Sequence, residues 1–369
     1  MSARSDARFP GECSAAAWGD REFTDPIAAA DGMRALARRA RFVTATPEWH
    51  SACVLSFHGS EQARRDCVAV CAGHVSAWAP LVRSERADGT WLELAGAEAL
   101  YEPGEILHQD VAALTALFER VLAFGEPVEL RRIRKEAAVA AALRRCARGR
   151  GWVFRVDAAR AIFLEPARCP DRNALFASGD RRRDLDRKRR RLAESGVPAF
   201  EWLKPDTSDV DRIVALALDI EGSGWKTHAG TSVAQKPALA KFVRHVTRAF
   251  AEQGRLIVAF LTLNGAPIAM QVILVHNSAW CELKIGYDPR WRPMSPGVLL
   301  AEATALKACE EGIERYEFMG NEEPRHGTFA HRAHEFETLV YVPLNRQGLR
   351  LLGKMVWERS RLKASASPV

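Results

Sequence analysis

The tightest local constraint on the fold is a pair of apolar segments joined by only two residues. Segments 256–263 (LIVAFLTL) and 266–275 (APIAMQVILV) are separated by Asn264 and Gly265. Asn-Gly is a preferred pair for a two-residue β-turn, because both central positions of that turn need a positive φ. The pattern therefore predicts an antiparallel hairpin. A third strand is expected at 279–287, followed by a turn rich in Pro and Gly, a helix at 297–311, and strands at 316–319 and 335–342.

Elements in a similar order are expected across the rest of the chain. The second half opens with a predicted strand at 200–203 and helices at 209–221 and 236–253. The first half predicts a helix at 26–39, strands at 67–71, 74–82 and 90–94, a helix at 111–122, a strand at 128–131 and a helix at 137–148. Strands followed by a crossover helix and another strand favour a mixed α/β sheet in each half. The likeness of CVAVCAGHVSAWAPLV to RLIVAFLTLNGAPIAMQVILV suggests a diverged duplication.

Composition and cysteine spacing set further limits. With 369 residues, 47% of them hydrophobic and 27% charged, the chain has the composition of packed globular domains. The expected domains are 1–170 and 171–345, and a basic amphipathic helix at 346–363 is expected within the tail 346–369. No segment has the apolar length of a membrane span or of a secretory signal, so a cytoplasmic protein is expected. The eight cysteines form no CxxC pair, which favours reduced thiols over a disulfide framework or a zinc site.

The positive charge is concentrated in one segment. Residues 181–191 (RRRDLDRKRRR) hold eight basic and two acidic side chains, a local net charge of +6 in a chain whose total is +7. Leu185 and Leu192 lie seven residues apart, so a helix would keep a narrow apolar seam and present arginines on its other faces. Two interpretations remain open: a solvated basic helix, or a surface for an anionic partner such as nucleic acid.

The most specific chemistry is expected between residues 287 and 300 (YDPRWRPMSPGVLL). A helix that begins at Gly297 leaves its first N–H groups unpaired, and these groups together with the helix dipole form a site for a pyrophosphate. Arginines just before the helix would add charge-assisted hydrogen bonds to the same anion. The candidate binding residues for such a cofactor are Arg290, Arg292, Ser295, Pro296, Gly297 and Val298.

The spacing from Arg292 to Leu300, R-x-x-S-x-G-x-x-L, resembles the R/Q-x-x-G-x-G/A-x-x-L loop with which GNAT-superfamily acetyltransferases hold the pyrophosphate of coenzyme A. The chain as a whole resembles the branch related to the cellulose-biosynthesis protein CelD, whose members are tandem GNAT-like proteins akin to Fem-type aminoacyltransferases. Five segments carry this resemblance in order: RRRDLDRKRRRL, EGSGWKTHAGT, LNGAPIAM, KIGYDPRWRPMSPG and YEFMGNEEPRH. Two departures are Ser295, in place of the first loop glycine, and Arg325-His326, where an aromatic residue and a lysine are usual.

The resemblance implies two tandem GNAT-like domains, of which the first is degenerate, since no R-x-x-G-x-G loop precedes Arg150. It implies an N-acyltransferase that moves an acyl group from acetyl-CoA or another acyl-CoA, or from an acyl carrier protein, to an amine of a small molecule or a sugar, in polysaccharide or secondary metabolism. A Fem-like alternative is transfer of an aminoacyl group from aminoacyl-tRNA, with the arginine-rich helix on the tRNA.

Acyl transfer from a thioester needs a neutral amine, a polarised carbonyl and a proton for the departing thiolate. The resemblance and the residue types make Glu221, Tyr287, Asp288 and His326 the candidate catalytic residues, with Glu282 and Tyr316 as further candidates. The candidate substrate-binding residues are Trp225, Lys226, Lys284, Asn321 and Glu322. Simple packing remains the alternative for Trp225 and the tyrosines. The spacing of His326, His331 and His334 lacks further ligands, so no metal is expected.

Overall fold

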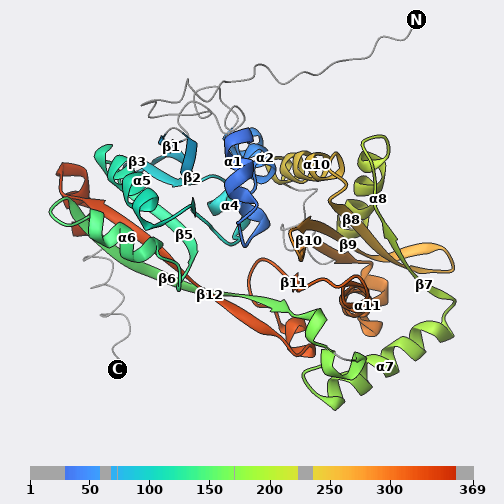
Figure 1. The fold of residues 1–369 in the computed structure, drawn as a ribbon. Helices are drawn as coiled ribbons and strands as arrows, with labels where there is room; N and C mark the ends of the chain where they lie inside the picture. The colour runs from blue at the N-terminus through green and yellow to red at the C-terminus, as the bar shows by residue number, and fades with distance from the viewer. Residues whose placement is uncertain (1–29, 59–67, 73, 170, 223–235, 355–369) are drawn as a thin grey trace, which may run out of the picture.

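The structure is a computed structural model that describes residues 30–58, 68–72, 74–169, 171–222 and 236–354 (Figure 1). A single mixed sheet of 12 strands extends through the described residues in the order β1-β2-β3-β5-β12-β6-β11-β10-β9-β8-β7, with β4 beside β2. The predicted mixed α/β fold is confirmed. The two halves of the chain share this sheet.

The strands are β1 Val68–Ala72, β2 His74–Arg86, β3 Gly89–Leu94, β4 Leu107–His108, β5 Val128–Arg134, β6 Gly151–Leu164, β7 Pro198–Leu203, β8 Leu256–Leu263, β9 Ala266–His276, β10 Ala279–Tyr287, β11 Arg315–Glu317 and β12 Arg332–Pro343. The α-helices are α1 Ala30–Ala37, α2 Pro47–Phe57, α4 Ala97–Leu100, α5 Val111–Ala123, α6 Val139–Cys146, α7 Gly179–Glu194, α8 Val210–Gly222, α10 Pro237–Ala251 and α11 Pro296–Glu310. The short 3-10 helices η6 (Pro289–Met294) and η7 (Pro324–Thr328) lie near the candidate site.

The predicted hairpin is confirmed at β8 and β9. Leu263 pairs with Ala266, and Asn264 and Gly265 have φ values of 50° and 80°, as a two-residue turn of this type requires. Every residue of β8 is buried. Alternate residues of β8 and β9 pack against helices α2, α8 and α10 on one face of the sheet and against α7 and α11 on the other. The second half therefore forms a sheet covered by helices on both faces.

Two long strands connect the halves. β12 pairs with β5 from Phe336 to Tyr341, and along its other edge it pairs with β6 from Arg332 to Pro343. The end of β6 pairs with β11, where Leu164 lies opposite Tyr316. The sheet therefore continues past residue 170, and the division of the chain at that residue stays a prediction.

The predicted arginine-rich helix is α7, and its seam is the expected one, because Leu185 and Leu192 are its buried residues. The segment 346–354 is helical, as expected for the start of the basic tail, and residues 355–369 lie outside the described residues. Within the described part of the chain, no helix is both long and apolar enough to cross a bilayer.

Candidate active site

Strands β10 and β11 separate in the second half and leave a gap in the sheet. They pair in parallel only from Ala279–Cys281 to Arg315–Glu317. β10 then continues to Tyr287 along β9. The N–H of Asp288 donates to the carbonyl of Ile268 on the β9 side. Because successive N–H groups of an extended strand point to opposite edges, the N–H of Tyr287 points toward the gap.

The turn after β10 delivers the N-terminus of α11 to the same place. Ser295 has φ 50° and ψ 52°, and α11 begins at Pro296. The carbonyl of Ser295 accepts hydrogen bonds from the N–H groups of Val298 and Leu299 at 3.0 and 3.1 Å. Pro296 has no N–H, and no described residue accepts from the N–H of Gly297. This amide and the positive end of the helix dipole are therefore available to an anion.

A cavity of about 650 Å³ lies between the end of β10, the N-terminus of α11 and η7. Six of the residues that line this cavity were candidates in the sequence analysis, and they come from three segments of the chain: Glu221, Tyr287, Arg292, Ser295, Gly297 and Val298. Glu221 is almost completely buried at the end of α8, where its backbone lies against Gly286; a Cβ at Gly286 would lie 2.7 Å from the Cα of Glu221. Gly286 thus permits the close approach that brings Glu221 to the cavity.

Asp288, Arg290 and Pro296 are not among the lining residues. The Asp288 carboxylate accepts from the backbone N–H of Arg290 at 3.0 Å and from its guanidinium, with Nη2 2.5 Å from Oδ2. This guanidinium hydrogen bond lowers the pKa of Asp288 below its ordinary value. The carboxylate is therefore a weak base that is already paired, and Arg290 is exposed beside it.

His326 is buried in η7 and does not line the cavity. Its Nδ1 accepts a hydrogen bond from the N–H of Glu323 at 3.0 Å, so the ring proton lies on Nε2, which has no partner among the described residues. Burial lowers the pKa of His326 to about 3. The ring is thus neutral at physiological pH and its one lone pair is already in use, which disfavours a role as general base.

Arg325 is a lining residue that the sequence patterns did not nominate as a ligand. Its Nη2 lies 2.7 Å from Oε1 of Glu282 and its Nε lies 2.7 Å from Oε2 of Glu323, while Nη1 has no partner among the described residues. Burial opposes its charge, but the two carboxylates outweigh burial and raise the pKa of Arg325 further. The sequence signal that could have pointed to Arg325 is that Arg325-His326 stand where an aromatic residue and a lysine are usual in the family.

Glu282 and Tyr316 belong to a buried hydrogen-bond network beside the gap. The Tyr316 hydroxyl donates to Oε2 of Glu282 at 2.9 Å, and Nε2 of Gln271 donates to both groups at 2.6 and 2.7 Å. Thr304 on α11 donates to Oε1 of Gln271 at 2.7 Å. Burial is the main cause that raises the pKa of Tyr316 well above its ordinary value. Neither side chain lines the cavity, so the network fixes α11 and β11 relative to β10.

The remaining candidates lie elsewhere. Trp225 and Lys226 fall outside the described residues. Lys284 on β10 is half-buried. It lies near Glu102, whose pKa is raised by burial, and the positive charge of Lys284 opposes this rise. Asn321 and Glu322 line a second cavity.

The three histidines of the 326–334 segment have separate partners. His331 Nδ1 lies 3.0 Å from the carbonyl oxygen of Phe329, and His334 Nε2 lies 3.0 Å from Oε2 of Glu317. Among the residues that the structure describes, no group of three or more His, Cys, Asp or Glu side chains is arranged to hold a metal ion.

Comparison with known proteins bears on this geometry. Residues 179–326 match the family model described as Acetyltransferase (GNAT) domain, and this match covers the gap, the turn and α11. Residues 179–326 therefore resemble a GNAT acetyltransferase domain. The prediction of a GNAT-type acyltransferase is thereby confirmed. A search of curated proteins gives no match.

Solved structures share the fold over most of the chain. FemX has 11% sequence identity and a TM-score of 0.56, with 83% of this chain and 95% of FemX covered. The C-terminal domain of a protein described as a lysylphosphatidylglycerol synthetase, from Agrobacterium fabrum, has 13% identity and a TM-score of 0.51, with 90% and 96% covered. A protein of unknown function from Bacteroides thetaiotaomicron has 13% identity and a TM-score of 0.50, with 88% and 99% covered. The fold shared with these structures therefore extends across both halves of the chain.

Proposed function

We propose that this GNAT domain transfers an acyl group from an acyl-CoA thioester to an amine, and that the 650 Å³ cavity receives the donor. The observation that carries the proposal is that one cavity connects the N-terminus of α11 with the gap between β10 and β11. The N–H of Gly297, Arg292 and Arg325 suit a pyrophosphate. Apolar walls from Ile285, Val298 and Pro324 suit a pantetheine arm that leads into the gap.

The candidate catalytic groups then divide by position. Glu221 on the cavity wall accepts the proton of the attacking amine, directly or through water. The Tyr287 N–H that points toward the gap stabilises the negative charge that develops on the thioester oxygen. The Tyr287 hydroxyl supplies a proton to the departing thiolate. Both residues line the cavity, which supports these roles over roles for Asp288 and His326.

The finer assignment follows the sequence resemblance. We place the chain in the CelD-like branch of the superfamily, because five segments occur in the order typical of that branch. The acceptor is then an amine on a small molecule or a sugar, and the donor is acetyl-CoA, another acyl-CoA, or the thioester of an acyl carrier protein.

Substitution at Gly297 tests the donor site. A Cβ at Gly297 would lie 3.4 Å from Cδ1 of Tyr287, an ordinary contact, so Gly297→Ala should fold and bind CoA with little loss. Gly297→Asp places a carboxylate against the bound pyrophosphate, and we expect it to weaken CoA binding at least about 100-fold in titration calorimetry, since a buried like-charge contact costs several kcal/mol. Equal CoA affinity in the Asp variant and the wild type would contradict the proposal.

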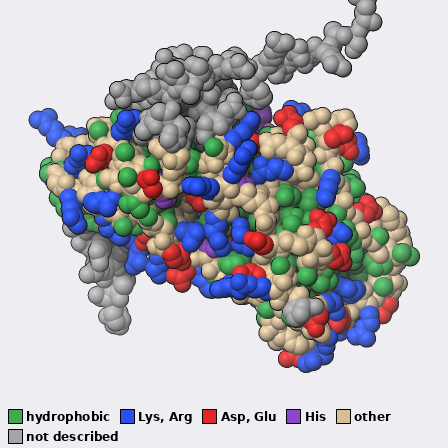
Figure 2. Space-filling model, viewed as in Figure 1, with side chains coloured by type: hydrophobic (Ala, Val, Ile, Leu, Met, Phe, Trp, Pro, Cys, Tyr) green, Lys and Arg blue, Asp and Glu red, His purple; other side chains and the backbone are tan. Residues whose placement is uncertain are grey.

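One observation favours the aminoacyl-tRNA alternative. Arg181, Arg190 and Arg191 on α7 are exposed and form no ion pair with a described residue, and α7 packs against η6 beside the donor cavity. Figure 2 shows basic and acidic side chains side by side over this part of the molecule. If tRNA carried the donor, replacing these arginines by Ala would lower tRNA affinity and its salt dependence, by about one unit of slope per phosphate contact, while leaving CoA binding unchanged.

A further inference from the structure

One wall of the gap between β10 and β11 is the segment that follows β11, residues 318–325, which we call the gap loop. The loop leaves β10 after Glu317, where the pairing of the two strands ends. Its last three residues line the donor cavity. There Nη2 of Arg325 lies 2.7 Å from Oε1 of Glu282 on β10. This end of the loop is therefore fixed to β10, and the position of the other end helps to set the width of the gap.

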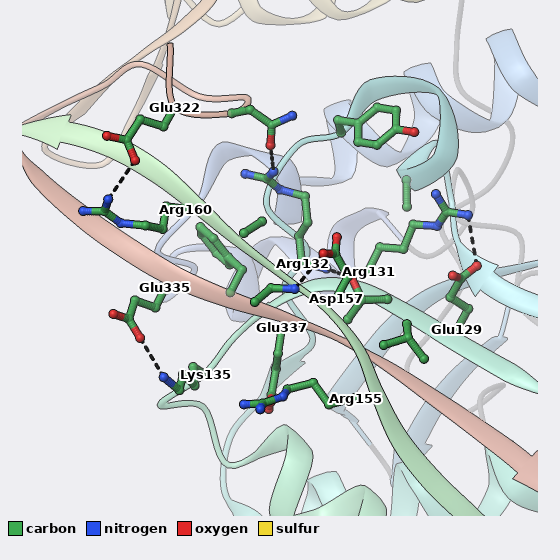
Figure 3. A pocket seen from close by; sticks show the side chains of 18 residues that line it. Glu129, Arg131, Arg132, Lys135, Arg155, Asp157, Arg160, Glu322, Glu335 and Glu337 are labelled. Atoms are coloured by element: carbon green, nitrogen blue, oxygen red, sulfur yellow. Dashed lines mark hydrogen bonds and ion pairs between the residues drawn. The ribbon is translucent and has the colours of Figure 1, made fainter. Parts of the chain in front are cut away.

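Two charged side chains from the first half of the chain hold that other end. Oε2 of Glu102 accepts a hydrogen bond from the N–H of Gly320 at 2.6 Å. Nη2 of Arg132 donates to the carbonyl of the same glycine at 2.6 Å, and Nη1 donates to the side chain of Asn321. Figure 3 shows the Arg132 side chain extending from β5, with a hydrogen bond at its guanidinium. Both backbone groups of Gly320 are thus held by residues that lie 218 and 188 positions earlier in the chain.

The two charged side chains also support each other. Arg132 is only 4% exposed. The N–H of Gly104 donates to the carbonyl of Arg132 at 3.0 Å, so the segment that carries Glu102 runs beside Arg132. Burial raises the pKa of Glu102 and lowers that of Arg132, and each charge opposes the shift of the other. Hydrogen bonds to ionised groups are about twice as strong as neutral ones, so Gly320 is held more firmly than backbone pairing alone would hold it.

Unfavourable backbone conformations gather at the same place. Among the described residues, six residues other than glycine have a positive φ. Two are asparagines in hairpin turns and one lies in the donor turn. The other three are Arg132, with φ 54°, and the residues directly before Glu102 and Gly320: Tyr101, with φ 56°, and Met319, with φ 55°. Such conformations persist only where the surrounding structure fixes them, and they are frequent at functional sites.

We infer that Glu102 and Arg132 are positioning residues for acyl transfer: by fixing Gly320 they hold the gap loop away from β10 and keep the gap open for the thioester. The inference rests on the proposed acyl transfer. The N–H of Tyr287 polarises the thioester carbonyl only within hydrogen-bond distance, and the opposite wall decides how the thioester lies against it. A displacement of about 1 Å at a reacting centre can cost about 100-fold in rate. The first half, which has no donor loop of its own, thereby gains a function in the second.

Acetyl-CoA labelled with ¹³C at the carbonyl tests the inference and needs no acceptor. A hydrogen bond from an N–H moves the ¹³C signal of a carbonyl downfield, so binding to the wild type should give a downfield shift. Glu102→Leu and Arg132→Met each remove one contact to Gly320 and should lose at least half of that shift. Glu102→Gln keeps an oxygen for the Gly320 N–H and should retain most of it. Glu126→Leu, which breaks a pair with Arg83 elsewhere in the first half, should retain all of it.

CoA calorimetry on the same variants separates a change in the gap from a change in the donor site. CoA affinity should stay within about threefold of wild type, well under 1 kcal/mol, because the pyrophosphate contacts proposed at Gly297 and Arg292 do not involve Gly320. Urea unfolding establishes which variants are folded under the conditions of the NMR measurement. A role in stability alone would lower the free energy of unfolding and leave the carbonyl signal of the folded protein unchanged. If one of the two contact-removing variants does not fold, the other decides, since each removes a different contact.

The outcomes distinguish this inference from the proposed function. The positioning role is wrong if Glu102→Leu and Arg132→Met keep the full wild-type shift, if Glu102→Gln loses as much of it as Glu102→Leu, or if CoA affinity falls in step with the shift. A wild type that binds acetyl-CoA without any carbonyl shift would also overturn it, because the gap then polarises no thioester. Absence of CoA binding to the wild type overturns the proposed donor site itself, and the positioning role with it.

Discussion

At the scale of single residues, the donor turn depends on backbone conformations that side chains rarely adopt. Ser295 occupies the left-handed region that glycine adopts without cost, and its side chain makes no capping hydrogen bond to α11. The sequence already showed serine where the family motif has glycine, and the structure supplies the reason why glycine suits this position. The turn holds Ser295 in this conformation because η6 ends and α11 begins there.

Ser295→Gly should therefore stabilise the protein. Left-handed backbone costs about 1–2 kcal/mol for a residue with a Cβ, and the greater freedom of glycine in the unfolded chain offsets about 0.5–1 kcal/mol, so a gain of about 0.5–1 kcal/mol is expected in urea unfolding. Ser295→Ala serves as the control and should change stability little, because the hydroxyl caps nothing. A loss of stability on introducing glycine would show that the hydroxyl has a role that the geometry does not reveal.

At the scale of elements, local patterns located most of the second half. The limits of β8 and β10 match the prediction, since turn residues lie at both ends of each strand. β6 was missed, because Arg155, Asp157 and Arg160 interrupt its apolar pattern and its pairing with β12 depends on residues about 180 positions away. Helix α2 was missed although its signal was present: Thr46 caps it, accepting from the N–H of Trp49, and Pro47 begins it.

The sequence likewise predicted one part of the candidate site and missed another. The turn residues Arg292, Ser295, Gly297 and Val298 follow from a local motif. Asp288 pairs locally, with Arg290 two residues away, whereas the buried ring of His326 and the charge pattern around Arg132 depend on tertiary neighbours. No local pattern in the sequence reports such contacts.

The contact between α7 and α11 is another example. Glu302 of α11 is completely buried, and it accepts from Nε of Arg172 at 2.5 Å and from Arg189 of α7. Arg189 thus anchors the arginine-rich helix to the helix that forms the donor site. The sequence alone left Arg189 facing either solvent or an anionic partner, and it did not predict the pairing with Glu302, which lies 113 residues further along the chain.

Glu302→Gln tests this anchor. Removing the charge leaves two arginines that have lost a charged partner, and because both are partly exposed we expect a loss of about 1–3 kcal/mol in urea unfolding. Glu310→Gln on the same helix provides the matched control. Glu310 forms an exposed pair with Lys307, so its loss should cost under about 0.5 kcal/mol. Equal effects of the two substitutions would exclude the anchoring role.

At the scale of the whole molecule, the fold buries histidines in both halves in a form that cannot accept a proton. Burial lowers the pKa of His50 to about 3, that of His276 to about 4 and that of His326 to about 3. His50 lies in α2, and neither of its ring nitrogens has a partner among the described residues. His276 lies 3.0 Å from the carbonyl of Ala40 and so links β9 to the N-terminal segment.

These histidines should make the protein lose stability in mild acid. Each has a lower pKa in the folded chain than in the unfolded chain, where about 6.5 is usual. As the pH falls below about 6.5, the unfolded chain binds protons that the folded chain does not, so the free energy of unfolding falls by up to about 1.4 kcal/mol per pH unit for each such histidine until its folded pKa is reached. His50→Leu removes one of these groups. The difference between wild-type and variant unfolding free energies, measured in urea between pH 7 and 4.5, should therefore grow steadily in favour of the variant below pH 6. Parallel pH profiles would show that His50 has the same pKa in the folded and the unfolded chain, and that the interior around it is more polar than its neighbours indicate.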